Sequence, residues 1–147
     1  MKKKVRVKVL FPYNWFEVRN IRISDKNGLI AKVPVNSDSI IEIDKSTKEL
    51  IFRIDLYRSK IILLNVETEE VFVSVYFNIS DYFPLDIIQG MLPNSLMAKE
   101  IGSLEKYNEL THKTYYKSAE EKVSNLKLDI FNIIYFTDFC RCKIFIW

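Results

Sequence analysis

Histidine, the side chain that most often performs acid–base catalysis, occurs once in this chain of 147 residues. A Ser-His-Asp or Cys-His mechanism would have to use His112, because no other histidine is present. His112 lies in the polar segment NELTHKTYY between two predicted helices, a position typical of an exposed or helix-capping histidine. The three glycines are scattered, whereas phosphate-binding loops and dinucleotide fingerprints need clustered ones. The sequence therefore predicts no catalytic residue, no cofactor and no enzyme activity.

Metal binding is the next chemistry to consider, because Cys140 and Cys142 form a C-x-C pair. A structural zinc site needs four ligands, and beyond these two the chain has no further cysteine and only one histidine, His112. We therefore predict no metal site, and we interpret the two cysteines as small semi-apolar residues.

The sequence also predicts where the protein resides. Cysteines this close together suit a reducing compartment, since a secreted domain usually joins distant segments. The N-terminal segment MKKKVRVKVLF resembles the start of a signal peptide, but Arg6 and Lys8 interrupt the apolar run that a signal needs. Nor does any window offer the roughly 18 uncharged apolar residues of a membrane helix. We expect a cytoplasmic protein without a membrane span.

Basic side chains are the remaining residues with binding chemistry. Residues 1–80 carry 14 basic and 10 acidic side chains, whereas residues 81–147 carry 8 and 9. A sheet face that mixes basic and aromatic groups binds single-stranded nucleic acid by stacking and phosphate contact. Such a face would combine the aromatic residues Tyr13, Trp15, Phe16 and Tyr57 with basic residues that include Arg19 and Arg22, and the expected nucleic-acid contacts are Lys2, Lys3, Lys4, Arg53, Arg58 and Lys60. Because the acidic residues nearly balance the basic ones, we keep nucleic-acid binding as the alternative function.

The elements that would position these residues are strands. From residue 4 to residue 79 apolar and polar side chains alternate with a period of two, as in KVRVKVL, where valines alternate with basic residues. About seven such runs follow one another at intervals of roughly ten residues, joined by polar turns such as SDKNG. The pattern predicts an antiparallel β-sandwich over residues 1–80. Pro34, which cannot donate to a ladder, indicates that its strand lies at an edge.

The segment FRIDLYRSKIILL combines apolar residues with four charged ones. On a continuous strand Phe52, Ile54 and Leu56 share one face, and Arg53 and Asp55 share the other. We interpret the charged face as solvent-exposed, with an ion pair between Arg53 and Asp55.

After Ile79 the period changes to that of helices, so residues 81–147 are predicted to form two or three helices. Pro84 can start a short helix that ends near Gly90, and Asn94 or Ser95 can cap a second one. This helical extension would pack on the sandwich or on a partner subunit. Residues 128–147, rich in β-branched and aromatic side chains, suit either a helix or a returning edge strand.

A third helical segment shows the spacing of a helix–helix seam. Its apolar positions step by three and four residues, the a/d pattern that buries one stripe of a helix. The predicted interaction seam consists of Tyr116, Ala119, Val123, Leu126, Ile130 and Ile133. The seam suits a protein partner or a homo-oligomer as well as packing within one chain.

The stretch IRISDKNGLIAKVPVNSDSIIEIDKSTKELIFRIDLYRSKIILLN, residues 21–65, resembles the small β-sandwich modules related to the PEGA domain of uncharacterised bacterial proteins. Asp25 and Gly28 occupy the turn of that pattern, and Asp55, Tyr57 and Ser59 match its final strand. The resemblance implies a bacterial carrier or interaction domain without a catalytic site. Together with the patterns above, it predicts a non-enzymatic protein-interaction or structural module.

Overall fold

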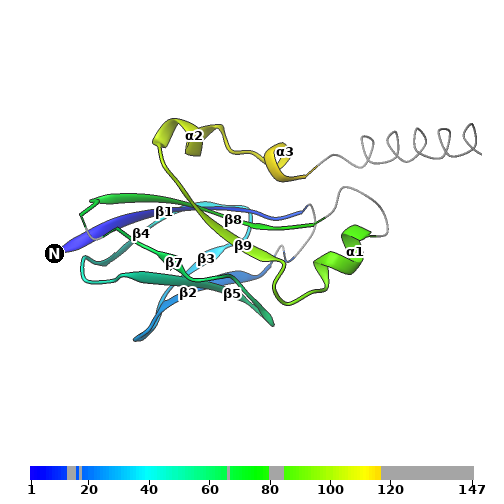
Figure 1. The fold of residues 1–147 in the computed structure, drawn as a ribbon, viewed down its shortest axis with the longest axis horizontal. Helices are drawn as coiled ribbons and strands as arrows, with labels where there is room; N and C mark the ends of the chain where they lie inside the picture. Colours follow the sequence, from blue (N-terminus) through cyan, green and yellow to red (C-terminus); the bar gives the residue numbers. More distant parts are fainter. Residues whose placement is uncertain (13–15, 17, 66, 80–84, 117–147) are drawn as a thin grey trace, which may run out of the picture.

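The computed structural model describes residues 1–12, 16, 18–65, 67–79 and 85–116 (Figure 1). Two sheets face each other, which confirms the predicted β-sandwich followed by helices. The first sheet has the order β4-β1-β8-β9, with β4 at Asp38–Asp44, β1 at Lys2–Leu10, β8 at Glu70–Phe77 and β9 at Leu96–Ile101. The second sheet has the order β3-β2-β5-β6, and its strands are β3 Gly28–Pro34, β2 Asn20–Asp25, β5 Glu49–Ile54 and β6 Tyr57–Arg58, with β7 Ile62–Leu63 also paired to β5.

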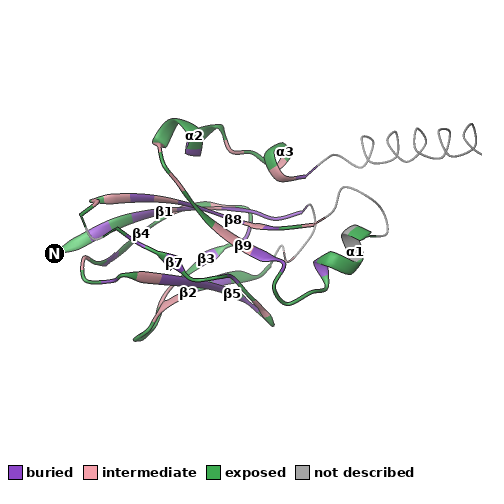
Figure 2. Ribbon diagram, viewed as in Figure 1, coloured by how far each residue is buried: buried purple, intermediate pink, exposed green. Residues whose placement is uncertain are grey.

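The alternation of side chains determines which face of each strand is buried. On β1 the side chains of Val5, Val7 and Val9 are fully buried between the sheets. Ile21 and Ile23 of β2 enclose the same core from the opposite side. Burying each such side chain stabilises the fold by roughly 1.5–3 kcal/mol. The strands thus carry most of the buried residues, while the helices are mostly exposed (Figure 2).

One strand pairing differs from the expected antiparallel pattern. β1 and β8 are parallel, with Lys4 opposite Glu70 and Leu10 opposite Tyr76. Parallel neighbours need a long crossover, and here the chain between them forms β4 and the whole second sheet. β3, the strand that ends at Pro34, lies at the edge of the second sheet, as its proline predicts.

The helix predicted after Asn94 or Ser95 is wrong for its first part, because Leu96–Ile101 form β9. β9 pairs with β8 in antiparallel register, for example Ser74 with Lys99. The open edge of β8 offers this segment hydrogen bonds that a short local helix cannot match. The helix begins later, at α2 (Leu104–Glu109), where Ser103 accepts a hydrogen bond from the backbone N–H of Lys106 at 3.3 Å. The segment after residue 80 therefore supplies a strand as well as helices.

Three short helices complete the described chain. α1 (Leu85–Gly90) ends at Gly90, as predicted, and α3 spans His112–Tyr115. Figure 1 shows α2 and α3 on the side of the first sheet that faces away from the second sheet. The ring of Tyr107 lies 5.3 Å from that of Phe72, and Tyr115 stacks on Tyr76 at 3.9 Å between ring centroids. These aromatic contacts hold α2 and α3 on the outer face of the first sheet.

Candidate functional site

Four cationic side chains lie side by side across the second sheet. Lys32 on β3 pairs in register with Arg22 on β2. Arg22 pairs with Arg53 on β5, and Arg53 pairs with Arg58 on β6. Residues directly opposite each other on neighbouring strands project from the same face, and all four are exposed. We call Lys32, Arg22, Arg53 and Arg58 the cation row.

The hydrophobic core holds the cation row on the outer face. Arg22 lies between Ile21 and Ile23, which are both fully buried, and Arg53 likewise lies between two core residues of β5. Because side chains alternate along a strand, burying these neighbours turns the guanidinium groups toward solvent. Neighbouring strands are about 4.8 Å apart, so the three intervals of the row span roughly 14 Å.

The charge of the cation row is not balanced within the described part of the chain. No described carboxylate forms an ion pair with any of its four members. Like charges directly opposite on neighbouring strands destabilise a sheet. The row therefore costs stability in the free protein, and an anion placed over it would relieve that cost.

Two hollows flank Arg22 on the protein surface. One, of about 440 Å³, lies between Arg22, Arg53 and the turn residues 24–29. The other, of about 230 Å³, is lined by Val18, Arg19, Asn20, Arg22, Lys32 and Asp55. The cation row thus has concave surface on both sides of Arg22.

The carboxylates that line these hollows already have other partners. Asp25 accepts hydrogen bonds from the backbone N–H groups of Asn27 and Gly28, at 2.7 and 3.0 Å. This contact closes the turn between β2 and β3, where Gly28 has a φ of 134°. Asp55 lies 3.6 Å from the Nη1 atom of Arg19. Neither carboxylate forms an ion pair with a member of the cation row.

The predicted ion pair between Arg53 and Asp55 is wrong. β5 ends at Ile54, and the chain turns at Asp55, whose φ is 48°. The two side chains are therefore not same-face neighbours on one strand, and the turn directs the Asp55 carboxylate to Arg19. Arg53 is left with only cationic neighbours in register, Arg22 and Arg58.

The basic residues of the first sheet, in contrast, have acidic partners. Lys2 pairs with Glu42 at 3.1 Å, and Arg6 pairs with Glu70 at 2.8 Å. Lys4 lies opposite the same two carboxylates in the register of β4 and β8. The predicted contacts Lys2 and Lys4 thus belong to a balanced face, which lies on a different sheet from the cation row.

Lys3 and Lys60 complete the predicted set of nucleic-acid contacts. The Lys3 side chain is fully buried and donates a hydrogen bond to the carbonyl oxygen of Asn65 at 2.9 Å, so the expectation that it contacts a nucleic acid is wrong. The reason is strand phase, because Lys3 lies on the same face of β1 as Val5. Lys60 is exposed but lies after β6, outside the register of the cation row. The predicted contacts on the row are Arg53 and Arg58, Arg22 is among the basic residues of the predicted face, and sequence reasoning did not assign Lys32 to a site.

The aromatic part of the predicted nucleic-acid face is partly buried against the core where the structure describes it. The Phe16 ring stacks on Phe77 at 5.8 Å between centroids, and Tyr57 meets the same ring edge-on at 5.1 Å. Both side chains pack against the hydrophobic core. Tyr13 and Trp15 lie outside the described residues. A ligand on the cation row therefore meets charge and polar groups rather than the rings of Phe16 and Tyr57.

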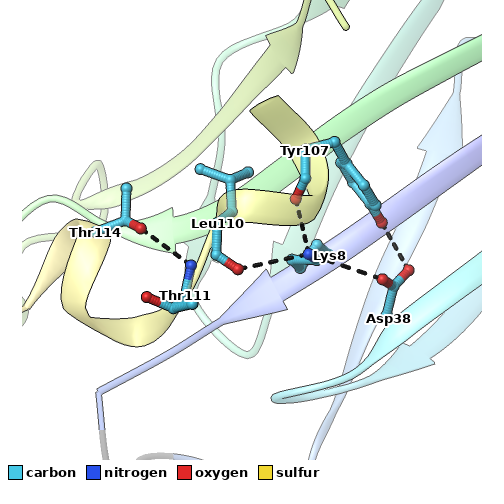
Figure 3. A network of polar contacts seen from close by, with 6 residues as sticks. All are labelled: Lys8, Asp38, Tyr107, Leu110, Thr111 and Thr114. Carbon is cyan, nitrogen blue, oxygen red and sulfur yellow. Dashed lines mark hydrogen bonds and ion pairs between the residues drawn. The ribbon is translucent and has the colours of Figure 1, made fainter. Parts of the chain in front are cut away.

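A second polar cluster, centred on Lys8, has a structural role (Figure 3). Its ammonium group donates hydrogen bonds to the carbonyl oxygens of Tyr107 and Leu110, at 2.7 and 3.5 Å, and lies 3.9 Å from Asp38. The Tyr107 hydroxyl donates to Asp38 at 2.7 Å, and burial together with this carboxylate raises the pKa of Tyr107. A cation near the last carbonyls of a helix stabilises that helix end. The cluster therefore fixes α2 to β1 and β4.

His112, the residue considered first for catalysis, is not part of the cation row. The Nε2 atom of His112 lies 3.0 Å from the Oδ1 atom of Asn36, a contact between α3 and the loop before β4. Within the described ranges, no group of three or more His, Cys, Asp or Glu side chains could hold a metal ion. Cys140 and Cys142 lie outside those ranges. The absence of a catalytic site stays a prediction.

The predicted interaction seam is described only at its first residue. Tyr116 is buried, and its hydroxyl donates to the carbonyl oxygen of Leu10 and accepts from the N–H of Phe77, both at 2.8 Å. Tyr116 thus belongs to the packing of this chain. The other five seam residues, Ala119, Val123, Leu126, Ile130 and Ile133, lie outside the described residues, as does the segment 128–147.

Comparisons of the chain with protein families, with curated proteins and with solved structures gave no match. The resemblance to PEGA-like modules therefore stays a prediction. Over the described part of the chain, no helix is long and apolar enough to cross a membrane.

Proposed function

We propose that the chain is a non-enzymatic binding module that holds an anionic macromolecule against the outer face of the second sheet. The observation that carries the proposal is the cation row, four exposed positive side chains in direct register without an ion-pair partner among the described residues. The proposal keeps the cytoplasmic location predicted from the sequence. A protein interface through the C-terminal segment stays a separate prediction.

The chemistry of arginine supports this function. Three of the four members of the cation row are arginines, whose planar guanidinium groups bind carboxylates and phosphates with two parallel hydrogen bonds. Neighbouring like charges raise the local positive potential and attract an oppositely charged partner from solution. The cross-strand register sets these groups at regular intervals, so a long anion can contact several of them at once.

Contrast with the first sheet also supports the choice of surface. The basic residues Lys2 and Arg6 each face a carboxylate across the strands, which lowers their attraction for an outside anion. Net charge alone would not separate the two sheets, because the whole chain carries only +3. The location of the unbalanced charge, rather than its total, favours the second sheet.

A charge-matched pair of variants tests the proposal on immobilised heparin, a polyanion. Arg22→Gln combined with Arg53→Gln removes two charges from the cation row, and Lys2→Gln combined with Lys4→Gln removes two from the first sheet. We expect the first variant to elute at clearly lower salt than the wild type, and the second to elute close to it. Equal elution of the two variants would overturn the proposed site, because net charge alone would then explain retention.

A further inference from the structure

We infer that Asn27 is a site of deamidation, and that the carboxylate formed there weakens the binding of anions to the cation row. Asn27 lies in the turn between β2 and β3, and it is the only asparagine in the sequence that is followed by a glycine. Deamidation depends on the chemistry of this turn alone, whereas its effect on binding rests on the proposed function and adds a means of regulating that site.

The pair Asn27–Gly28 has the composition that deamidation requires. The backbone nitrogen of Gly28 must reach the Cγ atom of Asn27 and close a ring, and a side chain on the following residue would hinder that approach. Glycine has no such side chain, and Gly28 has a φ of 134°, a conformation that other residues rarely adopt. Both residues are exposed, so water and hydroxide reach the turn.

Solvent supplies every reactant of the deamidation. Hydroxide takes the proton of the Gly28 N–H, the nitrogen forms a bond to the Cγ atom of Asn27, and the bond between Cγ and Nδ2 breaks. The leaving group takes a proton from water and departs as ammonia, which leaves a succinimide ring. Water then adds to either ring carbonyl and opens the ring to aspartate or isoaspartate. The net reaction converts an amide and water into a carboxylate and ammonium, with no change of oxidation state.

Asp25 controls the rate of this reaction. Its Oδ1 atom accepts a hydrogen bond from the N–H of Gly28 at 3.0 Å, and its Oδ2 atom accepts one from the Nδ2 atom of Asn27 at 3.4 Å. A hydrogen bond to a carboxylate stabilises the protonated nitrogen, so it slows the proton loss that starts ring closure. We therefore expect slow deamidation in the folded wild type and faster deamidation when Asp25 is replaced.

The product places a new negative charge beside the cation row. Asn27 lines the same hollow of about 440 Å³ as Arg22 and Arg53. A carboxylate at position 27 attracts these guanidinium groups and lowers the positive potential that an incoming anion meets. The isoaspartate product also adds a carbon atom to the backbone of the turn, where Asp25 pairs in register with Gly28. The deamidated protein therefore holds polyanions more weakly than the unmodified protein.

Incubation of the full-length protein in mildly alkaline buffer tests the chemistry. Peptide mass spectrometry should show Asn27 converted to aspartate and isoaspartate in the wild type, faster conversion in Asp25→Ala, and none at this position in Asn27→Gln. Equal rates in Asp25→Ala and the wild type would overturn the role of Asp25. A peptide of residues 21–33 is the unfolded control. If the peptide deamidates while Asn27 stays intact in the wild-type protein, the folded turn blocks the reaction and the inference is overturned.

Retention on immobilised heparin tests the effect on binding. Asn27→Asp carries the charge of the product, and we expect it to elute at lower salt than the wild type, by about as much as Arg22→Gln, since both changes lower the net charge equally. Asn108→Asp adds the same charge at an exposed position of α2 and should elute closer to the wild type.

The outcomes separate this inference from the proposed function. If Asn27→Asp and Asn108→Asp elute together while the double arginine variant still elutes earlier than the double lysine variant, the effect of deamidation on binding is overturned and the proposed function stands. If the double arginine and double lysine variants elute together, the proposed function and its regulation are both overturned.

Discussion

At the scale of single residues, Lys3 has its amino group inside the sandwich, with the carbonyl oxygen of Asn65 as a hydrogen-bond acceptor 2.9 Å away. Burial lowers the pKa of Lys3 below its ordinary value of 10.5 because the charged form loses its hydration. Nearby Glu100 opposes this shift and Lys45 adds to it. The protein therefore folds more easily when the Lys3 side chain is neutral.

This shift predicts how stability depends on pH. Between the lowered pKa of folded Lys3 and its ordinary value of 10.5, the unfolded chain binds more protons, so stability rises with pH. Below that window the cost of burying the charge is fully present, and above it the cost disappears. We expect the unfolding free energy of the wild type, relative to Lys3→Met, to rise as pH increases toward 10.5, as measured by urea melts.

Subtracting the variant from the wild type is necessary because other groups titrate in the same range. Burial raises the pKa of Tyr107 and of Tyr116, and a raised tyrosine pKa makes stability fall as pH rises. Both tyrosines are present in the wild type and in the variant, so their effect cancels. A difference for Lys3→Met that does not change with pH would show that the Lys3 amino group is hydrated in the folded protein.

At the scale of elements, the second sheet combines strong packing on its inner face with repulsion on its outer face. Arg53 lies between Arg22 and Arg58 in register, about 4.8 Å from each neighbouring strand. A directly opposite pair of like charges destabilises a sheet by a few tenths of a kcal/mol up to about 1 kcal/mol. Such a loss of stability is expected where residues are kept for binding rather than for stability.

We therefore expect Arg53→Gln to stabilise the protein while it weakens polyanion binding. The gain at low salt should be up to about 1 kcal/mol, and it should shrink in about 1 M salt, where the screening length falls to about 3 Å. Urea melts at the two salt concentrations measure this effect. Lys2→Gln is the control, because it removes an attractive pair with Glu42 and should give no stabilisation. Destabilisation by Arg53→Gln at both salt concentrations would contradict the repulsion.

At the scale of the whole molecule, the segment after residue 80 completes the first sheet and covers its outer face. β9 pairs along β8 from Leu96 opposite Phe77 to Ile101 opposite Phe72. The rings of Tyr107 and Tyr115 lie on that outer face of β8. Without this segment β8 would present an unpaired edge and an apolar surface, the two features that promote aggregation.

Truncation tests this dependence. We expect a chain that ends at Ile79 to aggregate, whereas a chain that ends at Tyr116 should remain monomeric with the melting behaviour of its sheets intact. Light scattering during size-exclusion chromatography compares the two chains with the full-length protein. A monomeric shorter chain that melts like the longer one would show that β9, α2 and α3 are dispensable for the sandwich.

Over residues 1–79 the sequence by itself determined most of the strands and the inner face of each, because side chains of a strand alternate and apolar ones must leave water. Val5, Val7 and Val9 are buried as their alternation predicts, and Pro34 ends an edge strand. The same alternation places Lys3 on the inner face with these valines, although its charge favoured a position on the surface.

Only the tertiary structure decided which strands are neighbours. Pairing depends on hydrogen bonds between segments far apart in the chain, so local patterns could not show that β1 and β8 run parallel or that Leu96–Ile101 form a strand. The candidate site depends on the same choice. Arg22 and Arg53 are 31 positions apart in the sequence, and they become neighbours because β2 pairs with β5. The sequence supplied the outward-facing cations, and the strand order aligned them in one row.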